Sequence, residues 1–558
     1  MKQLLFGTWL LGWFLSSAQL PAQSTPAQLE TSIDQLFAEH FKPDAPGAAV
    51  LVAQKGKIIY HKAFGMAHLE LNVPLRTDHV FRIGSITKQF TAAAILRLAE
   101  TGKLSLQDEL TRFLPDYPTH GKKITVEHLL THTSGIKSYT GMKEWDEQTH
   151  RKDFTPEELV AYFKDQPMDF DPGAEYRYNN SGYILLGYII EKVSGKTYAE
   201  YIREQFFMPL GMKNSYYGDT QPLIKNRASG YSQADNEGTY ANAAFLSMTQ
   251  PYAAGSLLST VEDLWIWTRA LHGGKVLQPE SLKKATTSYV LSNGTATNYG
   301  YGLQLGNLLG SPTVEHSGGI HGFLSDLLYL PKEEVCVAIL TNCDCEPPRE
   351  LSPRIAALLT GKTYQPEAVA INPALLNDYV GVYENDKKEQ RFITVENGEL
   401  YSMRKGGSRF KLLNYGADRF FFENSFARIE FLREKSGGKK VIKANVSDRS
   451  AAENAWVKTD QPLPAARPEL ALTEAQIAPF DGEYLMMPGF NITISHEGTQ
   501  LYCQATGQPR VEIFALTPTR FFLKVVDGEL EFTPDENGAW NKLLLDQGGR
   551  QLMGIRVK

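Results

Sequence analysis

The last third of the chain repeats itself at a constant spacing, and this constrains its fold more than any other feature. Each of four short motifs recurs 101 residues later: Gly381/Tyr383 as Gly482/Tyr484, Leu400-Tyr401 as Leu501-Tyr502, Arg419-Phe-Phe421 as Arg520-Phe-Phe522, and Glu430-Phe431 as Glu531-Phe532. A constant offset requires a duplicated domain. Short alternating apolar segments between Gly, Asn and Asp turns predict a small β-barrel for each copy, at 370–460 and 470–558.

The repeats carry no candidate nucleophile set, so their paired aromatic residues are predicted to form the barrel cores. The remaining chain is long enough for a further large domain, because 558 residues exceed what one core supports. Hydrophobic and charged contents of 42% and 22% are typical of a globular protein. A net charge of -6 without a basic stripe argues against nucleic acid, and we expect a small-molecule or short-peptide substrate and no cofactor.

The N-terminus has the pattern of an export signal. Lys2 precedes an apolar run from Leu4 to Leu15, and small residues then allow cleavage after Ala18 or Ala22. The run is too short to span a membrane comfortably, and no cysteine follows it for lipid attachment. We expect a signal peptide over residues 1–22 and a secreted or periplasmic mature protein without a transmembrane anchor.

Neither the cysteines nor the histidines form an evident metal site. Four cysteines do not form a disulfide scaffold in a chain of this length, and Cys343 and Cys345 are too close to pair easily with each other. We expect mostly buried thiols, since the spacing lacks the paired Cys-x-x-Cys of a zinc site. His128 and His132 lie four residues apart without a third ligand, and we expect His132 to hydrogen-bond local backbone near the following Ser-Gly turn.

Residues 81–100 place a serine at the start of a predicted helix and a lysine three residues later. Apolar residues recur at intervals of three and four after Lys88, so Ser85 falls at the helix N-terminus. Residues three apart share a helical face, so the lysine nitrogen can reach the serine oxygen. Ser-x-x-Lys occurs five more times in the chain and is weak evidence alone. With a lysine pKa lowered by burial from about 10.4, Ser85 is a candidate nucleophile and Lys88 its base.

A second motif follows a Pro-Gly turn at 172–173. Tyr178-x-Asn180 stands just before an apolar helix that is predicted to end near Gly195. A neighbouring ammonium favours a phenolate, so Tyr178 beside Lys88 is another candidate base. Asn180 would supply an amide to the same network.

A third motif, His316-Ser-Gly-Gly319, leads into a hairpin with strands at 323–330 and 335–340. An early hairpin spans 48–62, and helices lie between the two hairpins. This order predicts an antiparallel sheet made by both ends of the domain, with a helical insertion. The glycines allow strand N-H groups to approach a substrate closely.

Other turn-rich segments were given no chemical role. Ala254-Gly255-Ser256 and Asn298-Tyr-Gly-Tyr-Gly302 are interpreted as structural, while the polar stretch between Gly135 and Phe170 is a candidate wall of the substrate cleft.

Three motifs, taken in chain order, resemble those of the serine beta-lactamase and penicillin-binding-protein family, nearest its class C-like esterase and D-aminopeptidase branch. They are Ser85-Ile-Thr-Lys88, Tyr178-Asn-Asn180 and His316-Ser-Gly318. The resemblance implies an α/β (α+β) domain with an antiparallel sheet and a helical insertion, at 26–362. The two all-β repeats resemble the lipocalin-like barrels that follow this domain in some D-aminopeptidase-type members of the family.

The family's chemistry implies that Ser85 attacks a carbonyl, that Lys88 and Tyr178 move its proton, and that an acyl-enzyme forms and is hydrolysed. The backbone N-H groups of Ser85 and Gly319 would form the oxyanion hole. The remaining substrate-binding positions implied are Asn180, His316, Ser317 and Gly318.

One departure affects the expected substrate. Members that hydrolyse beta-lactams carry a lysine at the position of His316, and a histidine of ordinary pKa near 6.5 binds a substrate carboxylate less firmly. This favours an ester or a short D-amino-acid peptide or amide over the alternatives of D-Ala-D-Ala carboxypeptidase and beta-lactamase activity. A third alternative is a catalytically inert sensor or binding protein. The barrels would either restrict access to the Ser85 cleft or bind a partner.

Overall fold

The structure is a computed structural model that describes residues 25–218, 221–234, 238–345, 348–434, 440–450, 454–465, 467–487, 490–506 and 508–557. The expected signal peptide at residues 1–22 lies outside the described residues. Within the described ranges, no helix has the length and apolar character needed to cross a membrane.

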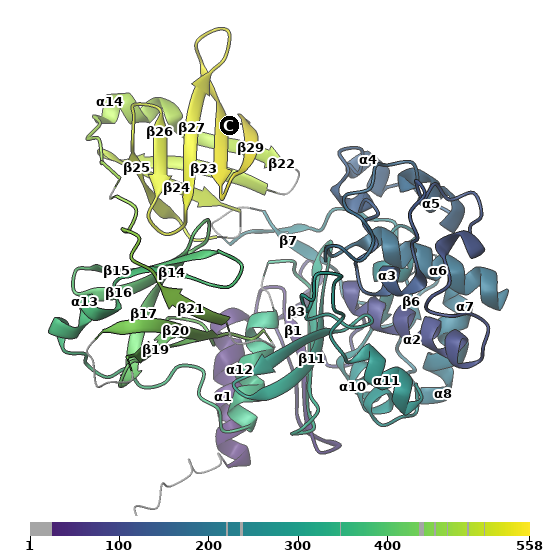
Figure 1. The fold of residues 1–558 in the computed structure, drawn as a ribbon. Helices are drawn as coiled ribbons and strands as arrows, with labels where there is room; N and C mark the ends of the chain where they lie inside the picture. The colour runs from purple at the N-terminus through teal and green to yellow at the C-terminus, as the bar shows by residue number, and fades with distance from the viewer. Residues whose placement is uncertain are drawn as a thin grey trace, which may run out of the picture.

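A six-stranded antiparallel sheet joins the two ends of the first domain (Figure 1). The early hairpin pairs with the last strand of the domain, so that Ala48 lies opposite Thr341. This confirms the predicted sheet with a helical insertion. In spatial order the strands are β10 (Gln304–Leu308), β11 (Ser311–Ile320), β12 (Phe323–Leu330), β13 (Val335–Thr341), β1 (Ala48–Gln54) and β2 (Lys57–Phe64).

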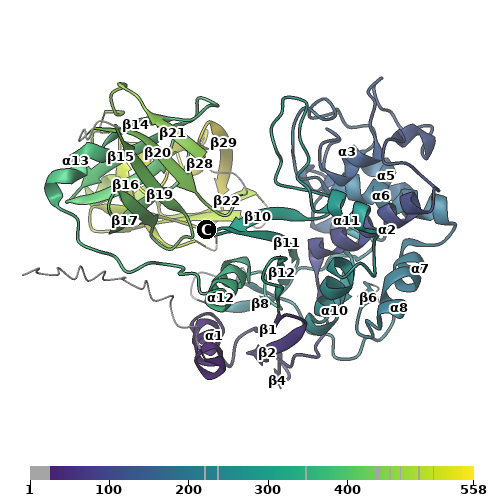
Figure 2. The same cartoon turned by 60° about the horizontal axis from the view of Figure 1, so that its bottom comes forward.

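The two faces of this sheet belong to different cores, because successive side chains of a strand point to opposite faces. Val52 of β1 packs in one core with Phe37, whereas its neighbour Leu51 belongs to the larger core shared with the helical insertion. Figure 2 shows the two helices that cover the first face lying side by side. The flanking helices are α1 (Pro26–His40) and α12 (Leu351–Leu359) on that face and α10 (Val261–His272) on the other.

The helical insertion contains two long helices that pack on each other. Nearly all of α2 is buried, and α6 packs on it. The Asn179 side chain caps the start of α6 by accepting from Gly182 N, and Gly195 ends it with a left-handed φ of 71°, as the sequence predicted. The helices are α2 (Thr87–Glu100), α3 (Val126–Leu130), α4 (Glu147–His150), α5 (Pro156–Phe163), α6 (Asn180–Ser194), α7 (Tyr198–Ile202), α8 (Met208–Leu210), α9 (Tyr252–Gly255) and α11 (Pro279–Ala285).

Each C-terminal repeat closes into an eight-stranded antiparallel barrel, which confirms the predicted duplication. Barrel 1 comprises β14 (Gly381–Glu384), β15 (Gln390–Glu396), β16 (Glu399–Arg404), β17 (Arg409–Gly416), β18 (Arg419–Phe422), β19 (Arg428–Arg433), β20 (Val441–Ser447) and β21 (Asn454–Lys458). Barrel 2 comprises β22 (Gly482–Met487), β23 (Phe490–Glu497), β24 (Gln500–Ala505), β25 (Val511–Ala515), β26 (Arg520–Leu523), β27 (Gly528–Pro534), β28 (Trp540–Gln547) and β29 (Arg550–Arg556).

The repeated aromatic residues serve the same structural purpose in both copies. The Tyr383 hydroxyl donates to the carbonyl of Tyr379 at 2.7 Å, and the Tyr484 hydroxyl donates to the carbonyl of Phe480 at 2.9 Å. The motif phenylalanine Phe532 is 1% exposed within its barrel core. The expectation that these residues are core is confirmed for Tyr383, Tyr484 and the motif phenylalanines, whereas Tyr401 and Tyr502 are half-buried and lie outside both barrel cores.

The expectation for the close cysteine pair is wrong. Cys343 and Cys345 form a disulfide, because the chain bends after β13 and brings their Cα atoms within 5.2 Å despite a separation of two residues. Cys336 and Cys503 are buried free thiols, as expected.

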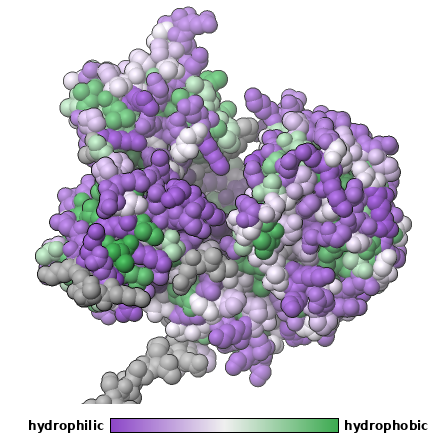
Figure 3. Space-filling view, viewed as in Figure 1, coloured by the Kyte–Doolittle hydropathy of each residue, from purple (hydrophilic) through white to green (hydrophobic). Residues whose placement is uncertain are grey.

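Barrel 1 contacts the sheet of the first domain at its β10–β11 edge. The Arg449 guanidinium pairs with Glu315 of β11, and the Arg449 carbonyl accepts from Asn307 N at 2.9 Å. Barrel 2 contacts barrel 1, where Arg409 N donates to the carbonyl of Val525 at 2.8 Å. The face in Figure 3 is hollowed between the barrels and the helical side of the first domain, with a mainly hydrophilic rim.

Candidate active site

The serine and the lysine of the first motif lie together at the junction of the sheet and the helical layer. Ser85 is the middle residue of a 3-10 turn, η1 (Gly84–Ile86), that runs directly into α2. The Lys88 side chain comes from the first turn of α2, and its Nζ lies 3.1 Å from Ser85 Oγ. Ser85 remains half-buried, whereas Lys88 is 0% exposed. The nucleophile is thus accessible while the amine is enclosed.

The Lys88 amine has two further partners, and both are acceptors. Nζ donates to Asn180 Oδ1 at 2.8 Å and to the Ala254 carbonyl at 2.9 Å. Burial holds the pKa of Lys88 well below its ordinary value, since removal from water disfavours the ammonium. A neutral amine has two N-H donors and one lone pair. With both donors used by Asn180 and Ala254, the lone pair faces Ser85 Oγ.

Ala254 was interpreted as structural from the sequence, yet its carbonyl is part of this site. Helix α9 is fixed against α2 because Thr91 Oγ1 donates to the Ala253 carbonyl at 2.6 Å. It is also packed closely on α6, where a Cβ at Gly187 would lie 2.4 Å from that of Ala253. Any residue type supplies a backbone carbonyl, so no side-chain pattern could have revealed this contact.

Tyr178 lies beside the Ser85–Lys88 pair. Its ring centroid is 4.8 Å from Lys88 Nζ, and its hydroxyl is near enough to Ser85 for the serine to influence its ionisation. Although 36% of the residue is exposed, the burial of the hydroxyl end raises the pKa of Tyr178 above its ordinary value, and the interaction with Ser85 only partly offsets this. The phenolate expected from the sequence is therefore disfavoured, because the neighbouring lysine is itself driven toward its neutral form.

His316 is enclosed on the same side of the site. It is 1% exposed, and burial, with a smaller contribution from Lys88, lowers the pKa of His316 to about 3. Its Nδ1-H donates to the Ser317 carbonyl at 2.7 Å, so Nε2 accepts from the Tyr299 hydroxyl at 3.0 Å. Tyr299, from a segment interpreted as structural, thus belongs to the site. The ring is neutral and has no free N-H for a ligand.

The glycines of the third motif bring β11 against the serine turn. A Cβ at Gly84, where φ is +49°, would lie 2.9 Å from Gly319 N, and a Cβ at Gly318 would lie 3.0 Å from Ser85 N. These close approaches exclude side chains from both sides of the contact, the η1 turn and strand β11. The backbone N-H groups of Ser85 and Gly319 consequently lie at neighbouring positions, as an oxyanion hole requires.

The two remaining motif residues differ in their surroundings. Asn180, the first residue of α6, links the insertion to the lysine and donates from Nδ2 to Thr140 Oγ1 at 3.2 Å, which places part of the 135–170 segment at the site. Ser317 is half-buried and lies opposite Asp326 in the β11–β12 ladder. The Ser317 side chain makes no hydrogen bond to Ser85 or Lys88 among the described residues.

The two histidines four residues apart have separate partners. His128 Nδ1 accepts from Thr125 N at 3.3 Å, in the cap of α3. His132 Nδ1 accepts from Asn179 N at 3.1 Å, a backbone group of the second motif and not of the adjacent Ser-Gly turn. His132 thereby holds the segment that carries Tyr178, with the two ring centroids 4.4 Å apart.

An antiparallel sheet whose Gly-rich strand faces a buried Ser-x-x-Lys pair is the architecture of the serine beta-lactamases and penicillin-binding proteins. The chain belongs to this family: the Beta-lactamase family model matches residues 33–362. A second model, a domain of unknown function (DUF3471), matches residues 466–554, which include barrel 2. The resemblance drawn from the three motifs is therefore confirmed.

Relatives that cover between 60% and 77% of this chain come from several organisms. Penicillin-binding protein 4* of Bacillus subtilis (strain 168) is 30% identical over 447 residues, 75% of this chain and 96% of that protein. An octameric penicillin-binding protein homologue from Pyrococcus abyssi is 30% identical, with a TM-score of 0.53 over 77% of this chain and 99% of that chain. D-amino acid amidase from Ochrobactrum anthropi SV3 is 26% identical, with a TM-score of 0.53 over 60% of this chain and 99% of that chain.

The two glycines of β11 provide a matched test of the oxyanion-hole geometry. A Cβ at Gly318 would lie 2.1 Å from the Ile83 carbonyl oxygen, so Gly318→Ala must push β11 away from the Ser85 turn, whereas a Cβ at Gly319 meets only Leu324 at 3.4 Å. Loss of one oxyanion donor typically costs about 100- to 1000-fold in kcat. We expect such a loss in Gly318→Ala and less than about 10-fold in Gly319→Ala, measured as ester turnover by variants with unchanged circular dichroism. Equal effects of the two substitutions would contradict this geometry.

Proposed function

We propose that this protein is a serine hydrolase that forms an acyl-enzyme at Ser85 and acts on an ester or a short peptide or amide containing a D-amino acid. The proposal is carried by the Lys88 amine, which is fully buried, 3.1 Å from Ser85 Oγ, and bonded to two acceptors on its other side. This arrangement provides a base that is neutral and oriented before the substrate arrives.

In the acylation step, Ser85 Oγ attacks the substrate carbonyl carbon while its proton passes to the Lys88 lone pair. The carbonyl oxygen becomes negatively charged and accepts from the Ser85 and Gly319 N-H groups. Collapse of this intermediate breaks the bond to the leaving group, which takes a proton from the Lys88 ammonium through the Tyr178 hydroxyl. Water then repeats the sequence on the acyl-enzyme and restores Ser85.

Tyr178 acts in this scheme as a neutral phenol. Its raised pKa makes it a poor base in the resting enzyme, whereas a phenol whose ring lies against Lys88 and whose hydroxyl interacts with Ser85 is suited to relay a proton between them. Lys88 is therefore the base that starts the reaction.

The state of His316 bears on the class of substrate. A neutral ring with both nitrogens engaged offers no positive charge to a substrate carboxylate. This favours an ester or an amide over a peptide that is recognised by its C-terminal carboxylate. Similarity to a D-amino acid amidase supports the amide, and similarity to penicillin-binding protein 4* supports the alternative of peptidoglycan carboxypeptidase or beta-lactamase activity.

Intact mass spectrometry and turnover together test the proposal. The mature protein and Ser85→Ala are exposed briefly to a penicillin, quenched in acid and weighed, and both are assayed with a simple ester and with a D-amino acid amide. We expect ester or amide turnover that Ser85→Ala reduces by at least about 1000-fold, because the nucleophile is lost. A penicillin adduct present only with Ser85 would shift the assignment to the peptidoglycan-directed alternative. If neither an adduct nor turnover is observed, the alternative of a catalytically inert binding protein is favoured.

We also propose that the protein is exported and loses its signal peptide near Ala22. The Cys343–Cys345 disulfide supports this, since disulfides persist in oxidising compartments. The same mass measurement on protein from the exporting host reports the N-terminus. A mass that retains residues 1–22 would contradict export by this signal.

For the barrels, we propose that they restrict access to the Ser85 cleft, since the Arg449 of barrel 1 pairs with Glu315, next to His316. Ending the chain at about residue 365 should then change turnover of large substrates more than that of a small ester. Arg449→Ala in the full chain is the control that removes this contact alone. Unchanged kinetics for both substrates after truncation would contradict restriction and favour a partner-binding role.

A further inference from the structure

The interior of barrel 1 contains a polar cluster at one end. Two arginine guanidiniums face the same indole: the Arg391 guanidinium carbon lies 4.7 Å from the Trp456 ring centroid, and that of Arg404 lies 5.5 Å from it. The two arginines are cross-strand partners in the β15–β16 ladder, so their side chains leave the sheet on one face. Arg391 also donates to Ser402 Oγ at 2.7 Å. We name these four residues the Trp456 site.

The hydrogen-bonding capacity of this site is incompletely used. Arg391 is 4% exposed and Trp456 is 0% exposed, yet Arg391 Nε and Trp456 Nε1 have no acceptor among the described residues. Asp448 lies 4.0 Å from Arg404 and is the single carboxylate within ion-pair distance of either guanidinium in the described part of the chain. The two guanidiniums and the two donors without an acceptor therefore have a single carboxylate nearby, and it pairs with Arg404.

Burying such groups is unfavourable without compensation. Burial and the nearby Arg404 charge lower the pKa of Arg391 to about 9, which reflects this cost. If these positions served only to fill the barrel core, apolar side chains would suffice, as they do in barrel 2.

Barrel 2 carries apolar residues at all four corresponding positions. The ladders that follow Tyr383 and Tyr484 align the two copies strand by strand. A Cβ at the residue that replaces Trp456 would lie 2.3 Å from Met486 Sδ, so the methionine fills the volume of the indole. The replacements for Arg391, Ser402, Arg404 and Trp456 are Ile492, Cys503, Ala505 and Gly554.

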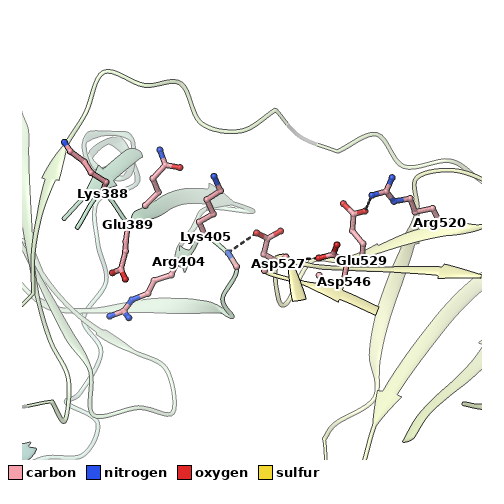
Figure 4. Close-up of a pocket in the computed structure, with 13 residues that line it drawn as sticks. Lys388, Glu389, Arg404, Lys405, Arg520, Asp527, Glu529 and Asp546 are labelled. Carbon is pink, nitrogen blue, oxygen red and sulfur yellow. Dashed lines mark hydrogen bonds and ion pairs between the residues drawn. The ribbon is translucent and has the colours of Figure 1, made fainter. Parts of the chain in front are cut away.

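One residue of the site, Arg404, borders open space between the barrels. Arg404 lines a cavity of about 770 Å³ there, together with Lys388 and Lys405 of the same barrel (Figure 4). Neither lysine has an ion pair among the described residues, whereas Asp527 and Glu529 on the opposite wall are both paired with Arg467. Glu389 on the same wall also has no ion pair among the described residues, so the two unpaired lysines leave this wall with a net positive unpaired charge.

From this arrangement we propose that barrel 1 is an anion-binding barrel, in which Arg391, Arg404, Ser402 and Trp456 bind the carboxylate or phosphate group of a small organic ligand that enters from the inter-barrel cavity. Paired guanidiniums provide charge-assisted hydrogen bonds to either group, and the indole provides a flat apolar surface for the atoms next to it. Barrel 2 would not share this activity. The proposal is independent of the chemistry at Ser85.

Isothermal titration calorimetry on the full chain tests this directly, with inorganic phosphate and acetate as probes and acetamide as the uncharged counterpart of acetate. We expect at least one anion to bind, more tightly at low ionic strength, and acetamide not to bind. Whichever anion binds more tightly identifies the ligand group as phosphate or carboxylate. Failure of both anions to bind the wild-type protein would overturn the proposal.

Each site arginine of barrel 1 is replaced by the residue that barrel 2 has at the corresponding position. Arg391→Ile and Arg404→Ala should each weaken anion binding by at least about 10-fold, while Arg419→Ala, an exposed arginine of the same barrel, should not. Ester turnover should be unchanged in all three. Equal weakening by Arg419→Ala, or wild-type binding by both site variants, would contradict the assignment.

Thermal unfolding separates binding from a structural role of the arginine. In buffer without the bound anion, Arg391→Ile should unfold at or above the wild-type temperature because an under-compensated buried cation is removed, and the anion should raise only the wild-type value. A lower melting temperature of Arg391→Ile, together with no effect of the anion on the wild-type melting temperature, would show that Arg391 has only a structural role. If Arg391→Ile does not fold, Arg404→Ala, at the partly exposed position, provides the same comparison.

Discussion

The removal of one lysine amine from water is the interaction on which the catalytic half of the molecule depends. Lys88 is buried without a carboxylate partner in the described residues, and its nitrogen is instead surrounded by a serine hydroxyl, an amide oxygen and a backbone carbonyl. Each of these comes from a different element, η1, α6 and α9. The helical insertion must therefore pack correctly on α2 before the amine is both neutral and oriented, and this makes the packing of α2, α6 and α9 part of the chemistry.

The same low-polarity environment determines the states of the neighbouring groups. It raises the pKa of Tyr178 and lowers that of His316, so the site contains a neutral phenol and a neutral imidazole beside a neutral amine. Such a site has little charge with which to attract a charged substrate. It gains its reactivity from orientation and from the N-H groups where η1 meets β11, and the glycines at Gly84 and Gly318 make that contact possible.

The sequence predicted the parts of the structure that arise from side-chain patterns. The 101-residue offset predicted two barrels, and the order of hairpins and helices predicted the sheet and its insertion. It did not reveal Ala254, whose contribution is a backbone carbonyl, or Tyr299, whose contact with His316 depends on how a loop folds over the site. The Cys343–Cys345 bond was missed because sequence separation does not report a local bend of the chain. The phenolate assigned to Tyr178 failed since it assumed a charged lysine, and burial is a property of the packed structure.

The most direct test of the central claim is the pH dependence of the rate at which a fluorophosphonate modifies Ser85. A lowered lysine pKa means that the reactive neutral amine is present above that pKa and is lost as the pH falls through it. The labelling rate should therefore rise with pH to a plateau, and the midpoint of this rise should lie well below 10.4, the ordinary lysine pKa. Lys88→Arg should remove the rise. A rate that continues to increase up to pH 10, or that keeps its profile in Lys88→Arg, would show that the buried amine is not the base.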